Sequence, residues 1–206
     1  MRCKHVVGFL IVLILAGGCS HQYRATNLAT GQSQAHLDRS QSVLVIVPAD
    51  GAYGDKITPG SGYMVAQRTR AAFTKYSGDV RLADPALKDR DAQLAAARSE
   101  GAGYLAIPTI IVWEPRFTMF TGHRTHVLLQ MNVVEVGTGN DISSTALEAY
   151  SRKVSVSRLK VEGLLPRLIG NHVAVLYGDK PPPLPEEDDS DTGKDDNPDA
   201  AKPPSS

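Results

Sequence analysis

The apolar residues of this chain change their spacing between residues 42 and 178, and this pattern limits the folds that the chain can adopt. Residues 42–48 are a continuous run of mostly β-branched residues closed by Pro48, which is typical of a strand buried on both faces. Apolar residues at helical intervals follow, with Ser61 as a plausible N-cap and Gly78 beyond the end. A strand followed by a covering helix is the first unit of a layered α/β domain.

The same alternation continues further along the chain. We expect a short strand at residues 79–83, a helix at 89–100, and a buried strand at 104–113 in which Pro108 indicates a bulge or a sheet edge. Residues 126–136 alternate between apolar and polar, as a strand with one exposed face does.

The glycine-rich residues 137–141 predict a turn into a partner strand at about 142–154. A last helix, at about 161–177, contains Pro166, which should restrict its first turn or mark its true start. Its inward face would carry Val161, Leu165, Leu168, His172 and Leu176. We therefore predict an α/β fold, a single layered domain at residues 42–178 with a mixed β-sheet covered by helices.

The N-terminus has the layout of an export signal. Two basic residues precede an apolar run at 6–16, which is too short to span a bilayer, and small residues follow it. Ala16-Gly17-Gly18-Cys19 resembles the lipobox of bacterial lipoproteins, although Leu15 stands one place early. The resemblance implies cleavage after residue 18 and lipid on Cys19. The alternative is a secreted protein in which Cys19 has no special role. In lipoproteins of this type an Asp after the Cys favours the inner membrane, and Ser20 stands there instead, so the resemblance implies the periplasmic face of the outer membrane.

Two flanking segments differ in composition from the predicted domain. Residues 19–41 are polar and without clear periodicity, which predicts a lipidated flexible tether. Residues 179–206 should be a disordered tail, because 181–206 hold eight acidic against two basic residues and seven of the 13 prolines. Residues 19–180 hold 18 basic against 14 acidic residues, too weak an excess to indicate nucleic acid.

Two motifs invite a catalytic or metal-binding interpretation. Gly60-Ser61-Gly62 lies between a predicted strand and helix, but it matches neither a phosphate loop nor an esterase elbow, so we favour Ser61 as a helix cap over a nucleophile. His123 and His126 lack the further ligands that a zinc site needs, so we expect no metal and place them in an exposed loop. The sequence indicates no cofactor.

The segment from Trp113 to Phe120 is the candidate binding site. Trp113 is the only Trp and ends a predicted buried strand beside Glu114 and Arg116, so a core Trp with a local ion pair is the favoured interpretation. The functional alternative is a partner-binding patch, because Trp and Arg are common anchors of interfaces. Its members would be Trp113, Glu114, Arg116, Phe117 and Phe120.

Several short motifs resemble an uncharacterised family of Gram-negative lipoproteins that is known only as a domain of unknown function. They are Pro48-x-Asp50-Gly51-x-Tyr53-Gly54, Gly60-Ser61-Gly62, Tyr104-Leu105-x-x-Pro108-Thr109-Ile110-x-x-Trp113-Glu114-x-Arg116 and Val133-x-x-Val136-x-Thr138-Gly139. The resemblance covers about residues 40–178. The order of elements is more loosely similar to the N-terminal module of TolB and to the curli secretion lipoprotein. This resemblance implies an envelope module that binds a partner, and no known reaction.

Three classes of function remain open. The favoured one is a non-catalytic lipoprotein, held at the outer membrane through Cys19, that binds or helps to assemble another envelope component, either a protein or peptidoglycan. The second is an oligomerising subunit of a secretion or envelope assembly, although the oligomeric state is not fixed by the sequence. The third is a hydrolase of an envelope polymer, for which we find no paired carboxylates and no Ser, His and acid set.

Overall fold

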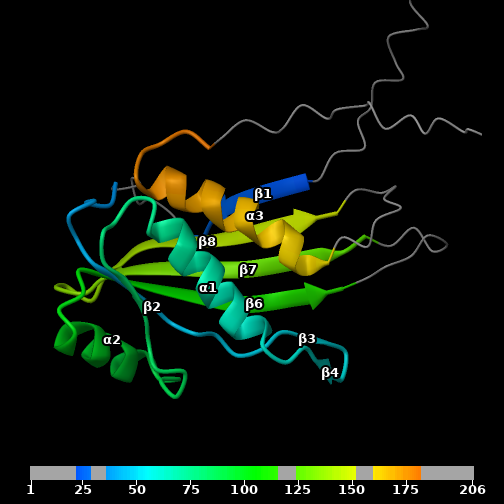
Figure 1. The fold of residues 1–206 in the computed structure, drawn as a ribbon, viewed down its shortest axis with the longest axis horizontal. Helices are drawn as coiled ribbons and strands as arrows, with labels where there is room; N and C mark the ends of the chain where they lie inside the picture. Colours follow the sequence, from blue (N-terminus) through cyan, green and yellow to red (C-terminus); the bar gives the residue numbers. More distant parts are fainter. Residues whose placement is uncertain (1–21, 29–35, 116–123, 152–159, 182–206) are drawn as a thin grey trace, which may run out of the picture.

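The computed structural model describes residues 22–28, 36–115, 124–151 and 160–181. In these residues a six-stranded sheet has the strand order β1-β8-β7-β6-β2-β5, and β3 and β4 form a separate small hairpin. Helices α1 and α3 lie side by side across one face of the large sheet, and α2 lies against the opposite face near one end (Figure 1). The predicted α/β class, with a mixed sheet covered by helices, is confirmed.

The parallel part of the sheet is built from strand and helix units. Strand β2 (Val43–Val45) pairs in parallel with β5 (Val80–Leu82) on one side and with β6 (Tyr104–Glu114) on the other. Helix α1 (Ser61–Phe73) connects β2 to β5, and α2 (Arg90–Ser99) connects β5 to β6. A connection between parallel strands must cross over one face of the sheet, and a helix in that connection buries its apolar side there. Both helices therefore show the predicted apolar spacing.

The rest of the sheet is antiparallel. Strand β7 (His126–Glu135) pairs with β6 and with β8 (Asp141–Tyr150), and α3 (Val161–Leu176) then returns across the face that α1 covers. The residues predicted for the inward side of α3 are all buried. Helix α3 begins at Val161 and continues through Pro166, so the proposal that Pro166 marks its start is wrong.

Strand β1 (Gln22–Asn27) corrects the predicted tether. It forms the edge of the large sheet, antiparallel to β8, within the segment that we expected to be a flexible linker from 19 to 41. Leu37 is also buried in the core, and its backbone N–H donates to the carbonyl of Leu176. The folded domain therefore includes residues before 42. A short hairpin of β3 (Ala52–Tyr53) and β4 (Lys56–Ile57) was not predicted either.

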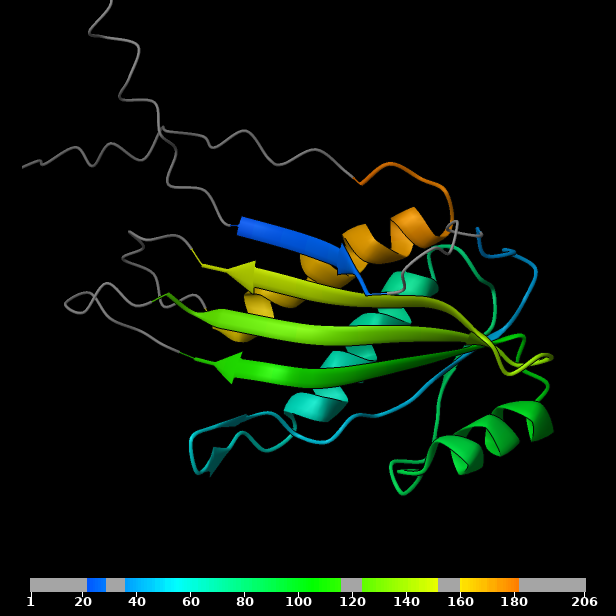
Figure 2. The ribbon, with the colours of Figure 1, turned by 180° about the vertical axis from the view of Figure 1, so that it is seen from behind.

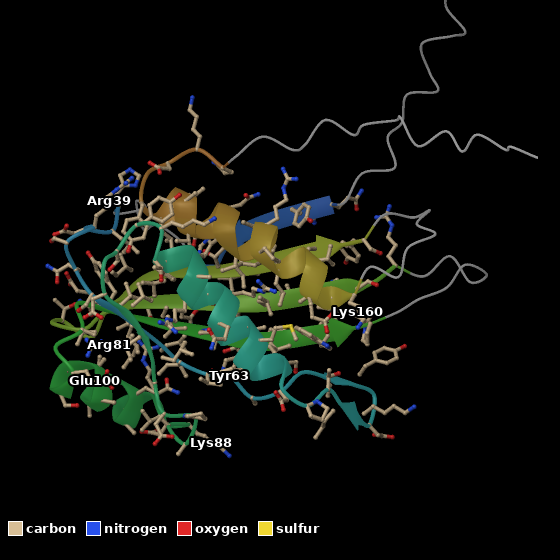
Figure 3. The ribbon with its side chains drawn as sticks, viewed as in Figure 1. Arg39, Tyr63, Arg81, Lys88, Glu100 and Lys160 are labelled. Carbon is tan, nitrogen blue, oxygen red and sulfur yellow. The ribbon has the colours of Figure 1, made fainter. Side chains whose placement is uncertain are left out.

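The apolar core is divided by the sheet into two parts. The larger part lies between the sheet and helices α1 and α3, and the smaller part lies under α2 and includes Leu44, Leu105 and Val134. Figure 3 shows the side chains of both layers, and the labelled Arg81 and Glu100 form an ion pair of 3.3 Å that joins β5 to the end of α2. Among the described residues, no helix is long and apolar enough to cross a membrane.

Pro108 was predicted to mark a bulge or a sheet edge, and the structure has a feature of each kind close to it. Strand β2 is paired with β6 only as far as Ala106, so Pro108 lies where β6 has lost that neighbour and no N–H is needed on that side. A β-bulge follows between Ile110 and Val112, in the pairing with β7. The second half of β6 therefore differs in register from the first.

Candidate functional site

The bulge in β6 decides which face each predicted site residue occupies. In a regular strand, Ile110 and Trp113 would lie on opposite faces because they are three residues apart. The extra residue in the bulge brings both side chains to the helix-covered face, where each packs in the core and close to Gly51. Trp113 is 1% exposed and is therefore a core residue, not a surface contact for a partner. Glu114 consequently projects to the opposite face.

Of the other predicted contact residues, Arg116, Phe117 and Phe120 lie outside the described residues, as does the lipid attachment site Cys19. His123 lies outside them as well. His126 is the first residue of β7, where the predicted strand at 126–136 begins, and it is partly buried, so its placement in an exposed loop is wrong. The structure thus brings Glu114 to the strand residue His126, with which it is paired in the sheet.

A cluster of four polar side chains forms where β6, β7 and β8 meet at one end of the sheet. His126 lies with its Nε2 3.0 Å from Glu148 Oε1 and its Nδ1 3.9 Å from Glu114 Oε2. The ring of Tyr150 stacks on the imidazole at a centroid distance of 4.2 Å, and its hydroxyl donates to Glu148 Oε1 at 2.8 Å. This donated hydrogen bond, with burial and the Glu148 charge, raises the pKa of Tyr150.

The cluster belongs to a sheet face that α1 and α3 do not cover. Residues paired across neighbouring strands project to the same side, so Val112, Leu128 and Glu148 share this face with Glu114 and His126. Arg24 of β1 is paired with Glu148 and extends the face toward the sheet edge. Figure 2 shows β1, β8, β7 and β6 from this side with no helix in front of them, while α2 lies near the far end.

Further along the same face the side chains form a polar row. Gln130 donates to the side-chain oxygen of Asn132 at 3.2 Å, and Ser144 donates to the same oxygen at 2.8 Å. The uncovered face therefore combines a polar row, two partly exposed apolar side chains and a carboxylate and imidazole cluster. We call this surface, formed by Glu114, His126, Leu128, Gln130, Asn132, Ser144, Glu148 and Tyr150, the open face.

The side chains of the open face can recognise polar, cationic or planar groups. Two carboxylates, an imidazole and a phenol can bind hydrogen-bond donors or cations and can stack on a planar group. In the described part of the chain, no group of three or more His, Cys, Asp or Glu residues is placed to hold a metal ion. The sequence could have suggested Glu148 and Tyr150 by their alternation, but their pairing with His126 depends on the strand register.

The Gly60-Ser61-Gly62 motif is structural, and its predicted capping role is wrong. Gly60 is the N-cap of α1, and the cap hydrogen bonds come from Asp50, whose carboxylate accepts from the N–H of Gly60 at 3.1 Å and of Gly62 at 2.8 Å. Ser61 is buried, donates to the Thr58 carbonyl at 2.7 Å and accepts from the N–H of Gly51 at 2.8 Å. The motif joins the loop after β2 to the start of α1.

These features define a class: an α/β layer domain with two helices on one sheet face and an open opposite face. The chain belongs to the family described as "Domain of unknown function (DUF4823)", whose sequence model matches residues 35–175. No curated protein matches the chain. The looser resemblance to the TolB and curli secretion modules stays a prediction.

The fold is shared with the solved structure of PelC at low sequence identity, and two lipoprotein structures are reported beside it for their similarity alone. The PelC dodecamer from Paraburkholderia phytofirmans is 19% identical, with a TM-score of 0.56 over 78% of this chain and 99% of PelC. The LpoB C-terminal domain from Salmonella enterica is 18% identical, with a TM-score of 0.42 over 58% of this chain and 89% of that domain. Lipoprotein GNA1162 from Neisseria meningitidis is 16% identical, with a TM-score of 0.40 over 68% of this chain and 99% of GNA1162.

Proposed function

We propose that this protein is a non-catalytic periplasmic lipoprotein, anchored in the outer membrane through lipid on Cys19, that uses its open face to bind another envelope component. The single observation that carries the proposal is that one sheet face has an organised polar cluster where no helix of the described residues lies over β1, β8, β7 and β6 (Figure 2). An antiparallel sheet commonly packs one face on the core and exposes the other to water. On the open side the partly exposed apolar residues Leu128 and Val112 lie among ordered polar side chains, and protein interfaces have this combination of an apolar centre with polar surroundings.

The lipobox resemblance at Ala16-Gly17-Gly18-Cys19 and the preceding export signal support the anchor and the periplasmic location. Two or more acyl chains on Cys19 would hold the protein stably at the membrane surface. The short distance in sequence between Cys19 and β1, which starts at Gln22, would keep the folded domain close to the lipid. The partner would therefore be a membrane-proximal protein or peptidoglycan.

Site-directed crosslinking in intact cells tests the proposal. A photoreactive phenylalanine analogue replaces Leu128, in the middle of the open face, and in a matched control it replaces Tyr63, which is 54% exposed on α1 and labelled in Figure 3. We expect a specific crosslinked product, identified by mass spectrometry, from position 128 only. The same product from position 63, or none from position 128, contradicts the proposal.

Substitutions in the His126 cluster test whether its polar side chains are needed for the crosslink. Glu148→Gln combined with His126→Ala should abolish the crosslink from position 128, because these residues hold the cluster together. Glu135→Gln, at the far end of the same strand as His126, is exposed and should leave the crosslink intact. If the first variant folds and retains the full crosslink, the open face does not recognise the partner.

A second candidate function is self-assembly. It is supported by the PelC structure, which is described as a dodecamer, and by β1, which forms one edge of the described sheet. In this case the partner of the open face or of the β1 edge is another copy of the chain. Sedimentation of the mature chain separates the two functions, because a monomer at all concentrations contradicts self-assembly and leaves the first proposal standing.

A further inference from the structure

The hairpin of β3 and β4 exposes two large apolar side chains. Ile57 is 66% exposed and Tyr53 is 42% exposed, and the other residues of both strands are exposed as well. Figure 1 shows the hairpin at one end of the molecule, beyond the start of α1. Single apolar residues on a surface are common, whereas two of them on a hairpin that buries none of its own strand residues indicate contact with something outside the domain.

The hairpin lies at the end of the sheet where β1 begins. Gln22, the first residue of β1, is paired with Tyr150 at the end of β8. Tyr150 is paired with His126, and His126 is paired with Glu114 at the end of β6. Strand β3 contacts β6. The start of β1 and the hairpin are therefore at the same end of the sheet and on opposite sides of it, as Figure 2 shows.

The lipid that we propose on Cys19 would hold this end of the domain at the membrane. Cys19 is three residues before Gln22, and three residues span at most about 11 Å. Strands β1, β8, β7 and β6 are successive neighbours about 4.8 Å apart, so the hairpin is displaced from β1 across the width of the sheet and not along the strands. An anchor at Cys19 therefore brings the hairpin within reach of the lipid surface.

Basic side chains outnumber acidic ones at this end. Lys56 is in the hairpin, Arg124 comes shortly before β7, and Lys160 is the N-cap of α3 and is labelled in Figure 3. Segments 116–123 and 152–159 lie outside the described residues, and their sequences contain four basic residues and no Asp or Glu. Each Lys or Arg near an anionic lipid surface is attracted to it. The acidic residues in or beside the hairpin and at the described ends of β6 and α3 are Asp50, Asp55, Glu114 and Glu162.

We infer that this end of the domain rests on a surface of anionic phospholipid, with Tyr53 and Ile57 of the hairpin among the lipid headgroups. This inference rests on the proposed anchor at Cys19. Tyrosine is enriched at the boundary between lipid and water, because its ring is apolar and its hydroxyl can remain hydrated. Lys56 can lay its aliphatic stem along the same boundary and direct its ammonium group to a phosphate. Asp55 in the turn keeps the hairpin at the depth of the headgroups, because a carboxylate is costly to bury in hydrocarbon.

The membrane contact also sets the orientation of the open face. The row from Gln22 to Glu114 lies at the lipid surface, and the strands run away from the membrane. The open face then stands upright beside the membrane and remains accessible to a partner. A single flexible anchor would leave this orientation free, whereas an anchor and a hairpin on opposite sides of the same end fix it.

Fluorescence quenching by lipid tests the contact. The mature chain has Cys19 as its only thiol, since Cys3 leaves with the signal, so it can be coupled to a maleimide lipid in vesicles of phosphatidylethanolamine and phosphatidylglycerol with brominated acyl chains. Tyr53→Trp reports on the hairpin, and Leu28→Trp, at a position that is 49% exposed just beyond the other end of β1, is the matched control. Trp113, which is 1% exposed, gives the background in the wild type. We expect bromolipid to quench the added Trp at position 53 and to leave the one at position 28 unquenched.

Partition of the uncoupled chain separates contact from mere proximity. The mature chain with Cys19→Ser is sedimented with the same vesicles and with vesicles of phosphatidylcholine alone, and it should bind the anionic vesicles more tightly. Ile57→Ser should lower the partition coefficient about tenfold, which corresponds to exposing one Ile side chain, and Leu28→Ser should leave it unchanged. Lys56→Gln should weaken binding to the anionic vesicles only. All three positions are exposed, so these variants should keep the melting temperature of the wild type.

Four results would overturn the inference: equal quenching at positions 53 and 28, no binding of the Cys19→Ser chain, equal binding to the two kinds of vesicle, or an Ile57→Ser partition coefficient within about twofold of the wild type. Chemical coupling replaces the natural anchor, so these outcomes do not depend on whether cells attach lipid to Cys19. They are also independent of the crosslink from position 128, which tests the open face.

Discussion

Gly62 is the position where one added methyl group should have the largest effect on this fold. A Cβ at residue 62 would lie 2.2 Å from the carbonyl oxygen of Pro48 and 3.2 Å from the carbonyl carbon of Ala49. These are backbone atoms of the loop after β2, so they cannot rotate away. The start of α1 or the loop must move by about 1 Å to reach ordinary contact.

The cost of this movement can be worked from the contacts around Gly62. Forcing a methyl group into a closed space costs about 1–3 kcal/mol. The same shift separates Asp50 from the N–H groups of Gly60 and Gly62, and losing part of such a charged cap costs about another 1 kcal/mol. We therefore expect Gly62→Ala to lower the free energy of unfolding by about 2–4 kcal/mol.

Gly170→Ala is the matched control. Gly170 lies inside α3, and a Cβ at residue 170 would meet no atom within 4 Å. Since Ala is favoured over Gly in helices, this variant should gain about 0.5–1 kcal/mol. Urea unfolding followed by the fluorescence of Trp113, the single Trp, measures both variants. If Gly62→Ala unfolds within about 0.5 kcal/mol of the wild type, the loop yields easily and the reasoning is wrong.

Three further predictions concern the core, the buried histidine and the anchor. Trp113→Ala should cost about 3–5 kcal/mol in urea unfolding followed by circular dichroism, and a loss under 1 kcal/mol would show that the side chain is not core. Because the folded pKa of His172 is about 4 and the unfolded value is 6.5, the unfolded chain takes up the proton first, so stability should fall by about 3 kcal/mol from pH 6.5 to pH 4. His172→Phe should remove this part of the pH dependence, and an unchanged pH profile would contradict it. Cys19→Ala should accumulate as uncleaved precursor on immunoblots of cell fractions, whereas normal processing would rule out the lipoprotein assignment.

The sequence predicted the elements whose residues carry a clear period. Helices α1, α2 and α3 and strands β6, β7 and β8 lie close to their expected ranges, because burial on one side imposes a spacing that can be read directly. Strand β1 has no such period. Only Tyr23 of its residues is partly buried, and its stability comes from backbone hydrogen bonds to β8, which leave no mark on the choice of side chains.

The candidate site was predicted only in part, because its side chains are brought together by strand register, which has no local signal in the sequence. The run that ends at Trp113 and Glu114 correctly indicated a buried strand end, and the favoured interpretation of Trp113 as core agrees with its burial. The cluster around His126 could not be read from the sequence, because the pairing of His126 with Tyr150 depends on an irregularity at Val133 and Val134 near the turn. A shift of one residue there would send Tyr150 to the other face.

The sequence by itself determined that this chain forms a layered α/β domain, because alternating strand and helix periods can bury their apolar residues in few other ways. The tertiary structure decided what the surfaces offer. The bulge in β6 turned Trp113 inward and Glu114 outward, and the pairing of β1 with β8 brought residues 23–27 beside His172. The open face and the packing of β1 beside α3 both depend on contacts between residues far apart in the chain, which local periodicity does not encode.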